Sequence, residues 1–111
     1  MDIETIDCLV IGGGPAGLMA AEVLSAAGRK VVLADAMPSL GRKFLMAGKS
    51  GLNLTMDAPA KEFAVQFTPP DWLGPIVAEF DPDAVQDWAR GLGQEVFRGS
   101  TGRVFPVAMK A

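Results

Sequence analysis

Three glycines near the amino terminus have the type and spacing of a phosphate-binding turn. Gly12, Gly14 and Gly17 stand in G-x-G-x-x-G order directly after the apolar run 6–11. In such a turn the first glycine permits a tight bend, the second lets a pyrophosphate approach the backbone, and the third lets the following helix pack closely on the strand. Free backbone amides and the positive end of the helix dipole would then face the phosphates. The residues that we predict to form this phosphate site are Gly12, Gly14, Pro15, Ala16 and Gly17.

A carboxylate follows at the distance expected of a ribose-binding acid. Asp35 ends the apolar run 31–34 and lies near the roughly 20-residue spacing from the glycine turn that this role requires. It could accept hydrogen bonds from both ribose hydroxyls, and it would repel a 2′-phosphate, which disfavours NADP at this site. The simpler alternative is an acid that only caps a loop. We predict a nucleotide site that includes Asp35 and its neighbour Ala36.

These groups must be positioned by a strand, a crossover helix and a second, parallel strand. The strands are predicted at 6–11 and 31–34, and the alanine-rich stretch 16–27 is predicted to be helical. Gly28 stands where a C-terminal helix cap is expected. The positions predicted to face the sheet are Leu18, Ala21, Val23, Leu24 and Ala27. Together these segments form one βαβ unit of a Rossmann-like α/β fold.

The next segment, residues 37–55, is long, rich in glycine and cationic. We expect an extended loop that brings Arg42, Lys43 and Lys49 toward the edge of the sheet that holds the glycine turn. Backbone amides of such a loop could cover a second phosphate or a flavin ring. An NAD-binding unit would normally continue into another helix and a third strand, so this loop favours FAD.

Three strings carry a resemblance to a known family: DCLVIGGGPAGLMAA at 7–21, GRKFLMAGKSGLNLT at 41–55 and STGRVFPVAMKA at 100–111. The chain resembles the BaiN/YhiN-type flavoproteins, described as predicted NAD(P)/FAD-dependent oxidoreductases. The resemblance implies a two-dinucleotide-binding-domain type of fold, FAD as cofactor and NAD(P)H as a candidate electron donor. It also implies that the glycine turn holds the FAD pyrophosphate, that Asp35 holds the adenosine ribose, and that the cofactor is lined by Arg42, Lys43, Gly48, Gly51 and Asn53.

The chain departs from that family in two places. Asp35 stands where the family usually has glutamate and is one methylene shorter, so its ribose contact is expected to be water-mediated. Many members read Gly-Gly-Gly-Arg-Cys-Asn where this chain has Gly-Lys-Ser-Gly-Leu-Asn at 48–53. No role for a thiol beside the flavin is therefore carried over, and the catalytic residues stay unknown.

The second half of the chain is predicted to hold short helices and a hairpin. The helices are expected at 61–67, with Phe63 and Phe67 on one face, then after a cap at Asp71, and then from a cap at Asp81 to Gly93. Strands at 96–97 and 103–105 would be joined around the turn 99–102. We expect Trp72 and Trp88, at helical spacing, to be core residues. Arg103 is either functional or part of a surface ion pair.

Length and composition bound what the chain can do. With 111 residues we expect two parts of one larger domain: the βαβ unit with its cofactor-covering loop at 1–56, and the helical segment with its hairpin at 57–111, as the amino-terminal portion of a longer protein. A formal net charge of −3 argues against nucleic acid and anionic membranes as partners, and no apolar run reaches the ~20 residues of a membrane span. One cysteine excludes an intrachain disulfide and suggests the cytoplasm, and the lack of histidine excludes histidine-based acid–base catalysis.

The sequence thus predicts an FAD-dependent oxidoreductase that acts on an unknown small-molecule substrate, with the rest of its own polypeptide as a partner. Two alternatives remain open at this point. One is an NAD-binding dehydrogenase without flavin, and the other is a non-enzymatic carrier of flavin.

Overall fold

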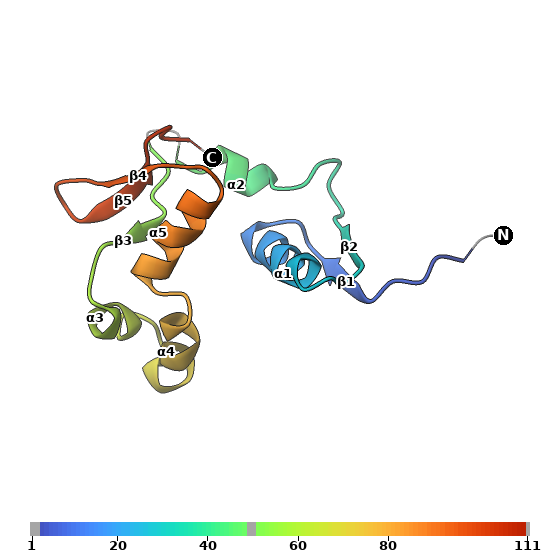
Figure 1. Cartoon of the computed structure of the whole chain (residues 1–111), viewed down its shortest axis with the longest axis horizontal. Helices are drawn as coiled ribbons and strands as arrows, with labels where there is room; N and C mark the ends of the chain where they lie inside the picture. Colours follow the sequence, from blue (N-terminus) through green and yellow to red (C-terminus); the bar gives the residue numbers. More distant parts are fainter. Residues whose placement is uncertain (1–2, 49–50, 111) are drawn as a thin grey trace. The chain divides into compact units, whose positions relative to one another are not determined.

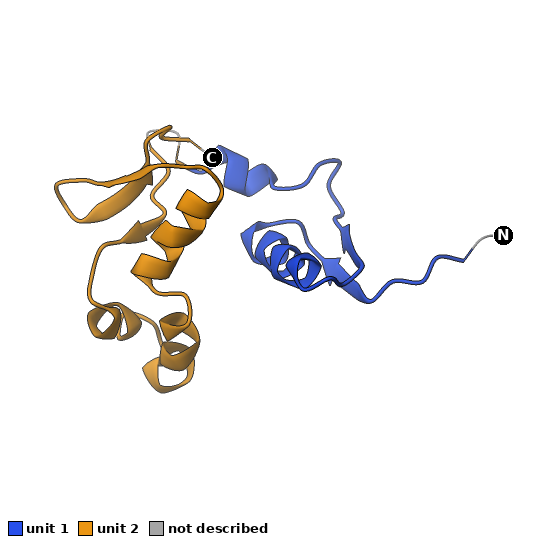
Figure 2. Cartoon of the chain, viewed as in Figure 1, with its two compact units in different colours: residues 1–47 blue, residues 48–111 orange. Residues whose placement is uncertain are grey.

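The computed structural model describes residues 3–48 and 51–110, and the chain divides into two compact units. The first unit is Met1–Ala47 and the second is Gly48–Ala111 (Figure 2). Each unit has its own sheet, so each is described by itself.

The first unit contains the predicted βαβ arrangement. Strand β1 (Cys8–Ile11) is followed by helix α1 (Pro15–Ala26) and strand β2 (Val31–Ala34), and α1 lies against both strands (Figure 1). The strands pair in parallel, with Cys8 opposite Val31 and Ile11 opposite Ala34. The Rossmann-like α/β fold class predicted from the sequence is confirmed.

The ends of α1 follow from the residues that form them. Gly14 is the N-cap, Pro15 occupies the first turn, and Gly28 adopts a left-handed φ of 82° just after the helix, as expected of a C-terminal stop. The predicted sheet-facing stripe is right in part, because Leu18, Ala21 and Leu24 are half-buried. The prediction was wrong for two positions that are exposed: Val23 lies about 100° around the helix from Leu24, and Ala27 comes after the last helical residue.

The segment after β2 is not the extended loop that we predicted. It includes a short helix, α2 (Arg42–Met46), which begins after Gly41 in a left-handed conformation with φ of 69°. Arginine, lysine, leucine and methionine are good helix formers, and no glycine or proline interrupts this run. The segment ends in strand β3 (Thr55–Met56), which is too short to show a two-residue periodicity in the sequence.

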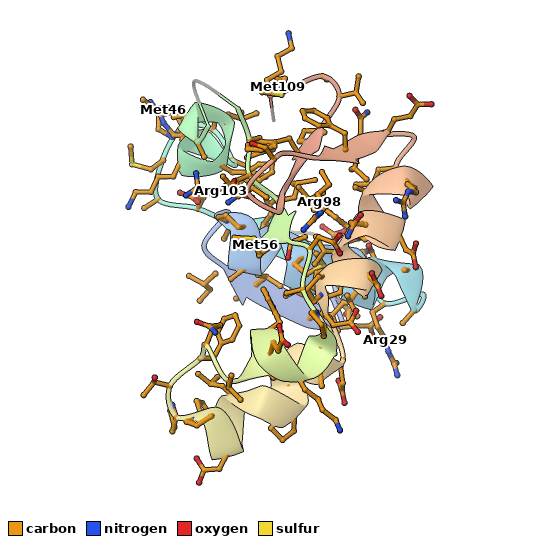
Figure 3. All side chains as sticks on the ribbon, turned by 90° about the vertical axis from the view of Figure 1, so that its left-hand side faces the viewer. Arg29, Met46, Met56, Arg98, Arg103 and Met109 are labelled. Carbon is orange, nitrogen blue, oxygen red and sulfur yellow. The ribbon has the colours of Figure 1, made fainter. Side chains whose placement is uncertain are left out.

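The second unit is built on an antiparallel sheet in the order β3-β5-β4. Strands β4 (Val96–Arg98) and β5 (Arg103–Pro106) form the predicted hairpin, with Phe97 opposite Phe105. A Cβ at Gly102, where φ is 89°, would lie 3.1 Å from the Met56 sulfur and 3.5 Å from Arg98 Nη2 (both side chains are labelled in Figure 3). The turn between β4 and β5 therefore favours a residue without a side chain at Gly102. Arg98 also forms an ion pair with Asp57, in which Arg98 Nε and Asp57 Oδ2 are 3.2 Å apart.

Three helices complete the second unit: α3 (Ala60–Ala64), α4 (Pro70–Ala78) and α5 (Pro82–Gly91). Helix α3 contacts α4, and α5 contacts β3 and β4. The buried residues of this unit include Leu52, Thr55, Pro82, Ala89 and Val104, and the side chain of Val104 is fully buried. The small core of the second unit thus forms where α5 covers the sheet.

Two sequence predictions for α4 were wrong. Pro69 is the N-cap and Asp71 lies in the first turn, so Asp71 does not cap the helix. Trp72 is 66% exposed and is not a core residue. The apolar side chains of α4 form two stripes, of which the one with Leu73 and Val77 is half-buried and the adjacent one with Trp72 and Ile76 is exposed.

Aromatic contacts in the second unit agree better with the sequence. Trp88 is half-buried and packs edge to face on Phe80, with ring centroids 6.4 Å apart. Phe63 and Phe67 also form an edge-to-face pair, at 5.3 Å. None of the helices in the described residues combines the length and the hydrophobicity that crossing a bilayer requires.

The predicted cap of α5 is confirmed, and it leads to a stability prediction. Asp81 Oδ1 accepts a hydrogen bond from the amide of Ala84 at 2.9 Å. Replacing Asp81 with alanine should lower the free energy of unfolding by about 1 kcal/mol, because that amide then loses its acceptor. Urea unfolding would measure the change. Asp81→Asn keeps a capping oxygen and should stay near the wild type, and an equal loss in both variants would contradict the capping role.

Candidate functional site

The first unit contains a pocket at the carboxyl ends of its two parallel strands. Its volume is about 160 Å³, and it is formed by the β1–α1 turn, the segment after β2 and the start of α2. Open α/β sheets bind their ligands in this position. The residues that line the pocket are Gly13, Gly14, Pro15, Asp35, Met37, Ser39, Arg42 and Lys43.

The three motif glycines meet different demands. Gly12 has a φ of 102°, which favours glycine, and its amide donates to the Ala34 carbonyl at 2.7 Å. A Cβ at Gly17 would collide with the carbonyl oxygen of Gly12. A Cβ at Gly14 would meet no protein atom within 4 Å, although Gly14 lines the pocket. The backbone conformation therefore explains the glycine at 12, and the close approach of helix and turn explains the glycine at 17. At 14 neither applies, and the absence of a side chain only keeps the pocket open.

The amino terminus of α1 is available to an anion. The amide of Leu18 donates to the Gly14 carbonyl at 2.9 Å, which is the first bond of the helix ladder. The amides of Ala16 and Gly17 precede that bond and have no acceptor within the helix. The first turn also holds no acidic residue that would neutralise its positive end. The predicted residues Pro15 and Ala16 are both exposed at this terminus.

Asp35 is held by two backbone amides. Its Oδ2 accepts from the Gly13 amide and its Oδ1 from the Met37 amide, each at 2.7 Å. The hydrogen bonds from Met37 and Gly13, and in addition the charge of Arg42, lower the pKa of Asp35 below its usual value of 3.8. The stabilisation from these bonds is therefore complete above that usual value and is lost as the pH falls through the lowered pKa. A carboxylate offers about four acceptor positions, so the two that are left could still take two hydroxyl groups.

Sequence reasoning missed Gly13, which connects the three walls of the pocket. Gly13 is buried, its amide donates to Asp35, and its carbonyl accepts from the Gly41 amide at 2.8 Å. A Cβ at Gly13 would come within 2.6 Å of the Leu40 side chain and 3.0 Å of Asp35 Oδ2. The signal was the run of three glycines at 12–14, of which the motif requires only the first and the third. Met37 and Ser39 were missed as well, because nothing in their type marks them.

Two cations come from α2. Arg42 and Lys43 are exposed residues of the pocket lining, as the sequence predicted, while Lys49 lies outside the described residues. With Asp35 they give the lining an excess of one positive charge, which suits a ligand with two negative charges better than a neutral one. The hydrogen bond between Gly41 and Gly13 ties the start of α2 to the glycine turn.

The other predicted cofactor residues are not in this lining. Ala36 is an exposed neighbour of Asp35, and Asn53 is exposed in the second unit. Gly48 and Gly51 also belong to the second unit, where the Gly51 amide donates to the Gly48 carbonyl at 2.9 Å. A Cβ would lie 2.6 Å from the Leu52 Cα at Gly48 and 2.6 Å from the Met109 Cε at Gly51. Contact with the backbone therefore already explains Gly48, and a φ of 149° favours glycine at Gly51, so the contact of both with a cofactor stays a prediction.

Outside the pocket, the groups that could bear chemistry are scattered in the part of the chain that the structure describes. No group of three or more possible metal ligands gathers within residues 3–48 and 51–110. Thr55 is 8% exposed on β3, and its hydroxyl has no hydrogen-bond partner in the described part of the chain, so no base activates it. Arg103 is an exposed residue of β5 that lies opposite Met56. The pocket of the first unit is the place where backbone donors, a carboxylate and cations converge.

Comparisons with known proteins agree with this geometry. Residues 6–111 match the family model described as the HI0933-like protein Rossmann domain. A curated relative, the ribosomal RNA dihydrouridine synthase of Escherichia coli (strain K12), is 40% identical over 53 residues. That alignment covers 48% of this chain and 13% of the relative, so the similarity concerns a small part of a longer protein.

Proposed function

This chain belongs to the HI0933-like Rossmann family, and we propose that it binds FAD as the cofactor-binding unit of a flavoprotein oxidoreductase. The family is of the flavoprotein, nucleotide-binding Rossmann type. The observation that carries the proposal is Gly14, where the chain leaves a side chain out although its own packing does not require this. The space that is kept open lies at the amino terminus of α1, where a phosphate is stabilised by free amides.

The residues present fit such a cofactor. Amides of Gly14, Ala16 and Gly17 would bind the pyrophosphate, and Asp35 would accept hydrogen bonds from the adenosine ribose. Arg42 and Lys43 would balance the charge of the two phosphates. When bound, the flavin supplies two-electron transfer chemistry, while the chain binds and orients it. NAD(P)H is the electron donor that we propose.

The open face of the first unit suggests where more polypeptide packs. Leu9, Ile11 and Val32 are 56%, 82% and 39% exposed on the two parallel strands. Parallel sheets are normally covered on both faces. We propose that a further part of the same protein covers these side chains and contributes to the site for the substrate.

We place the protein in the cytoplasm, which its single cysteine favours.

The name of the relative from Escherichia coli supports a second candidate for the substrate. Forming dihydrouridine is a two-electron reduction of a uracil ring, which is chemistry that a reduced flavin performs. The net charge of −3 argues against nucleic acid as a partner, so an RNA substrate would contradict that expectation. An unknown small molecule therefore remains the first candidate and a uridine of RNA the second.

The cofactor proposal predicts a yellow protein. The purified intact protein should show the visible absorbance of an oxidised flavin, and mass spectrometry of the released cofactor should identify FAD. The absorbance should bleach with NAD(P)H and return with an electron acceptor. Preparations that stay colourless after FAD is added would contradict the proposal, and tight NAD binding without FAD would favour the dehydrogenase alternative. Bound FAD that no donor reduces would favour a flavin carrier.

The two substrate candidates can be separated with the same protein. Ribosomal RNA is incubated with the FAD-loaded protein and NAD(P)H, digested to nucleosides and examined by mass spectrometry for uridine that has gained two hydrogens. Dihydrouridine that forms only with the protein and the donor present would select the RNA candidate. Turnover of NAD(P)H with a small-molecule acceptor and unchanged RNA would select the first candidate.

A further inference from the structure

Two aspartates hold the two ends of the parallel strand pair in the same manner. Asp7, before β1, accepts a hydrogen bond from the Lys30 amide at 2.8 Å, and Asp35, after β2, accepts one from the Gly13 amide at 2.7 Å. Each bond connects backbone and side chain across more than 20 residues of sequence. Only the bond to Asp35 lies at the pocket, because Gly13 and Asp35 are lining residues and Asp7 and Lys30 are not.

The bond to Asp35 acts on the peptide group that directly precedes those that a phosphate would use. Gly13 directly precedes Gly14, the N-cap of α1, so fixing the Gly13 amide restricts the orientation of the turn that leads into the helix. The Gly13 carbonyl is fixed as well, by the Gly41 amide at 2.8 Å. A side chain at Gly13 would disturb this arrangement, since its Cβ would lie 3.0 Å from Asp35 Oδ2 and 2.6 Å from the Leu40 side chain, and both side chains would have to shift.

We propose that Asp35 is a positioning residue for the phosphate turn: its hydrogen bond to the Gly13 amide pre-forms the turn before a nucleotide binds, independently of any contact with the ribose. The inference rests on the proposed nucleotide binding and adds a second role to the same carboxylate. A site that is already ordered in the free protein binds more tightly, because the ligand does not have to order it. The two roles are compatible, since each oxygen of Asp35 accepts one amide and has a further acceptor position.

The two roles differ in what they predict for a ligand without ribose hydroxyls. A ribose contact alone makes Asp35 irrelevant to such a ligand, and removal of its negative charge would slightly strengthen the binding of phosphates. A pre-formed turn makes Asp35 important for any ligand that carries the pyrophosphate. The direction of the change therefore separates the two.

The experiment compares ADP with its 2′,3′-dideoxy analogue, by calorimetry on the intact protein freed of cofactor. Asp35→Ala should weaken the analogue by about tenfold and ADP by more than that. Asp35→Asn, which keeps one acceptor oxygen, should give an intermediate loss for the analogue. Asp7→Asn is the matched control, because it perturbs the equivalent bond at the other end of the strands and should leave both affinities unchanged.

A spectroscopic measurement tests the bond without any ligand. In the wild type, the amide proton of Gly13 should resonate downfield and exchange slowly, as expected of a donor to a carboxylate, and both signatures should be lost in Asp35→Ala. An Asp35 variant that weakens ADP but leaves the analogue unaffected would overturn the positioning role while the nucleotide site stands. A wild-type protein that binds neither ligand would overturn the proposed function itself.

Discussion

Replacing Gly14 with glutamate is expected to abolish FAD incorporation by the intact protein while the fold is retained. The backbone of Gly14 has φ of −80° and ψ of −174°, which any residue adopts, and its Cβ would meet no protein atom within 4 Å. The new side chain would instead enter the pocket with a negative charge, at the position proposed for the pyrophosphate. We expect an affinity loss of at least about 100-fold, equivalent to ~2.7 kcal/mol. Flavin absorbance per protein, measured after dialysis against FAD, gives the occupancy.

The control is the same substitution at a site without ligand. Gly74 lies in α4, its Cβ would also meet no atom within 4 Å, and it does not line the pocket. Gly74→Glu changes the net charge equally and should keep full flavin occupancy. Gly14→Ala should reduce the affinity less than the glutamate does. Normal occupancy in Gly14→Glu would rule out the pyrophosphate assignment.

Replacing Gly17 with alanine is expected to damage the fold itself. A Cβ at this position would collide with the carbonyl oxygen of Gly12, and it would lie 3.4 Å from the Val10 side chain. One contact comes from the residue that directly follows β1 and the other from β1 itself, so helix and strand would have to move apart. Overpacking of this kind costs about 3 kcal/mol, which corresponds to a fall in Tm of roughly 10 °C for a domain of this size. Thermal unfolding followed by circular dichroism would measure it.

A second glycine-to-alanine change separates this clash from the general effect of the substitution. Gly91 ends α5, and its Cβ would meet nothing within 4 Å. Because alanine is the better helix former, Gly91→Ala should keep or slightly raise the Tm. A Tm for Gly17→Ala that matches the wild type would show that helix and strand do not depend on the close approach at this glycine.

The predictions that succeeded depend on neighbouring residues. The βαβ unit could be predicted because two apolar runs and an alanine-rich stretch each favour one local structure, and Asp81 could be predicted as a cap because it precedes a proline at a helix start. The burial of a side chain, by contrast, depends on distant packing. Trp72 has the helical spacing of a core residue, yet no part of the described second unit buries it.

The same division holds within the candidate site. The glycine turn and Asp35 can be recognised in the sequence by their residue types and spacing. The reason is that a phosphate-binding turn requires glycine, for steric reasons, at particular single positions. The sequence does not tell which glycine the chain itself needs. That difference became visible only when a Cβ at Gly17 met the Gly12 carbonyl and a Cβ at Gly14 met open space.

By itself, then, the sequence determined the βαβ unit, the glycine turn and the acid that follows the second strand. Only the tertiary structure decided that Gly13 joins the walls of the pocket, that Arg42 and Lys43 line it, and that Asp35 accepts two backbone amides. The reason is physical. Local preferences are set by a residue and its neighbours, whereas the bond from Gly13 to Asp35 spans 22 residues and exists only when the two strands lie side by side.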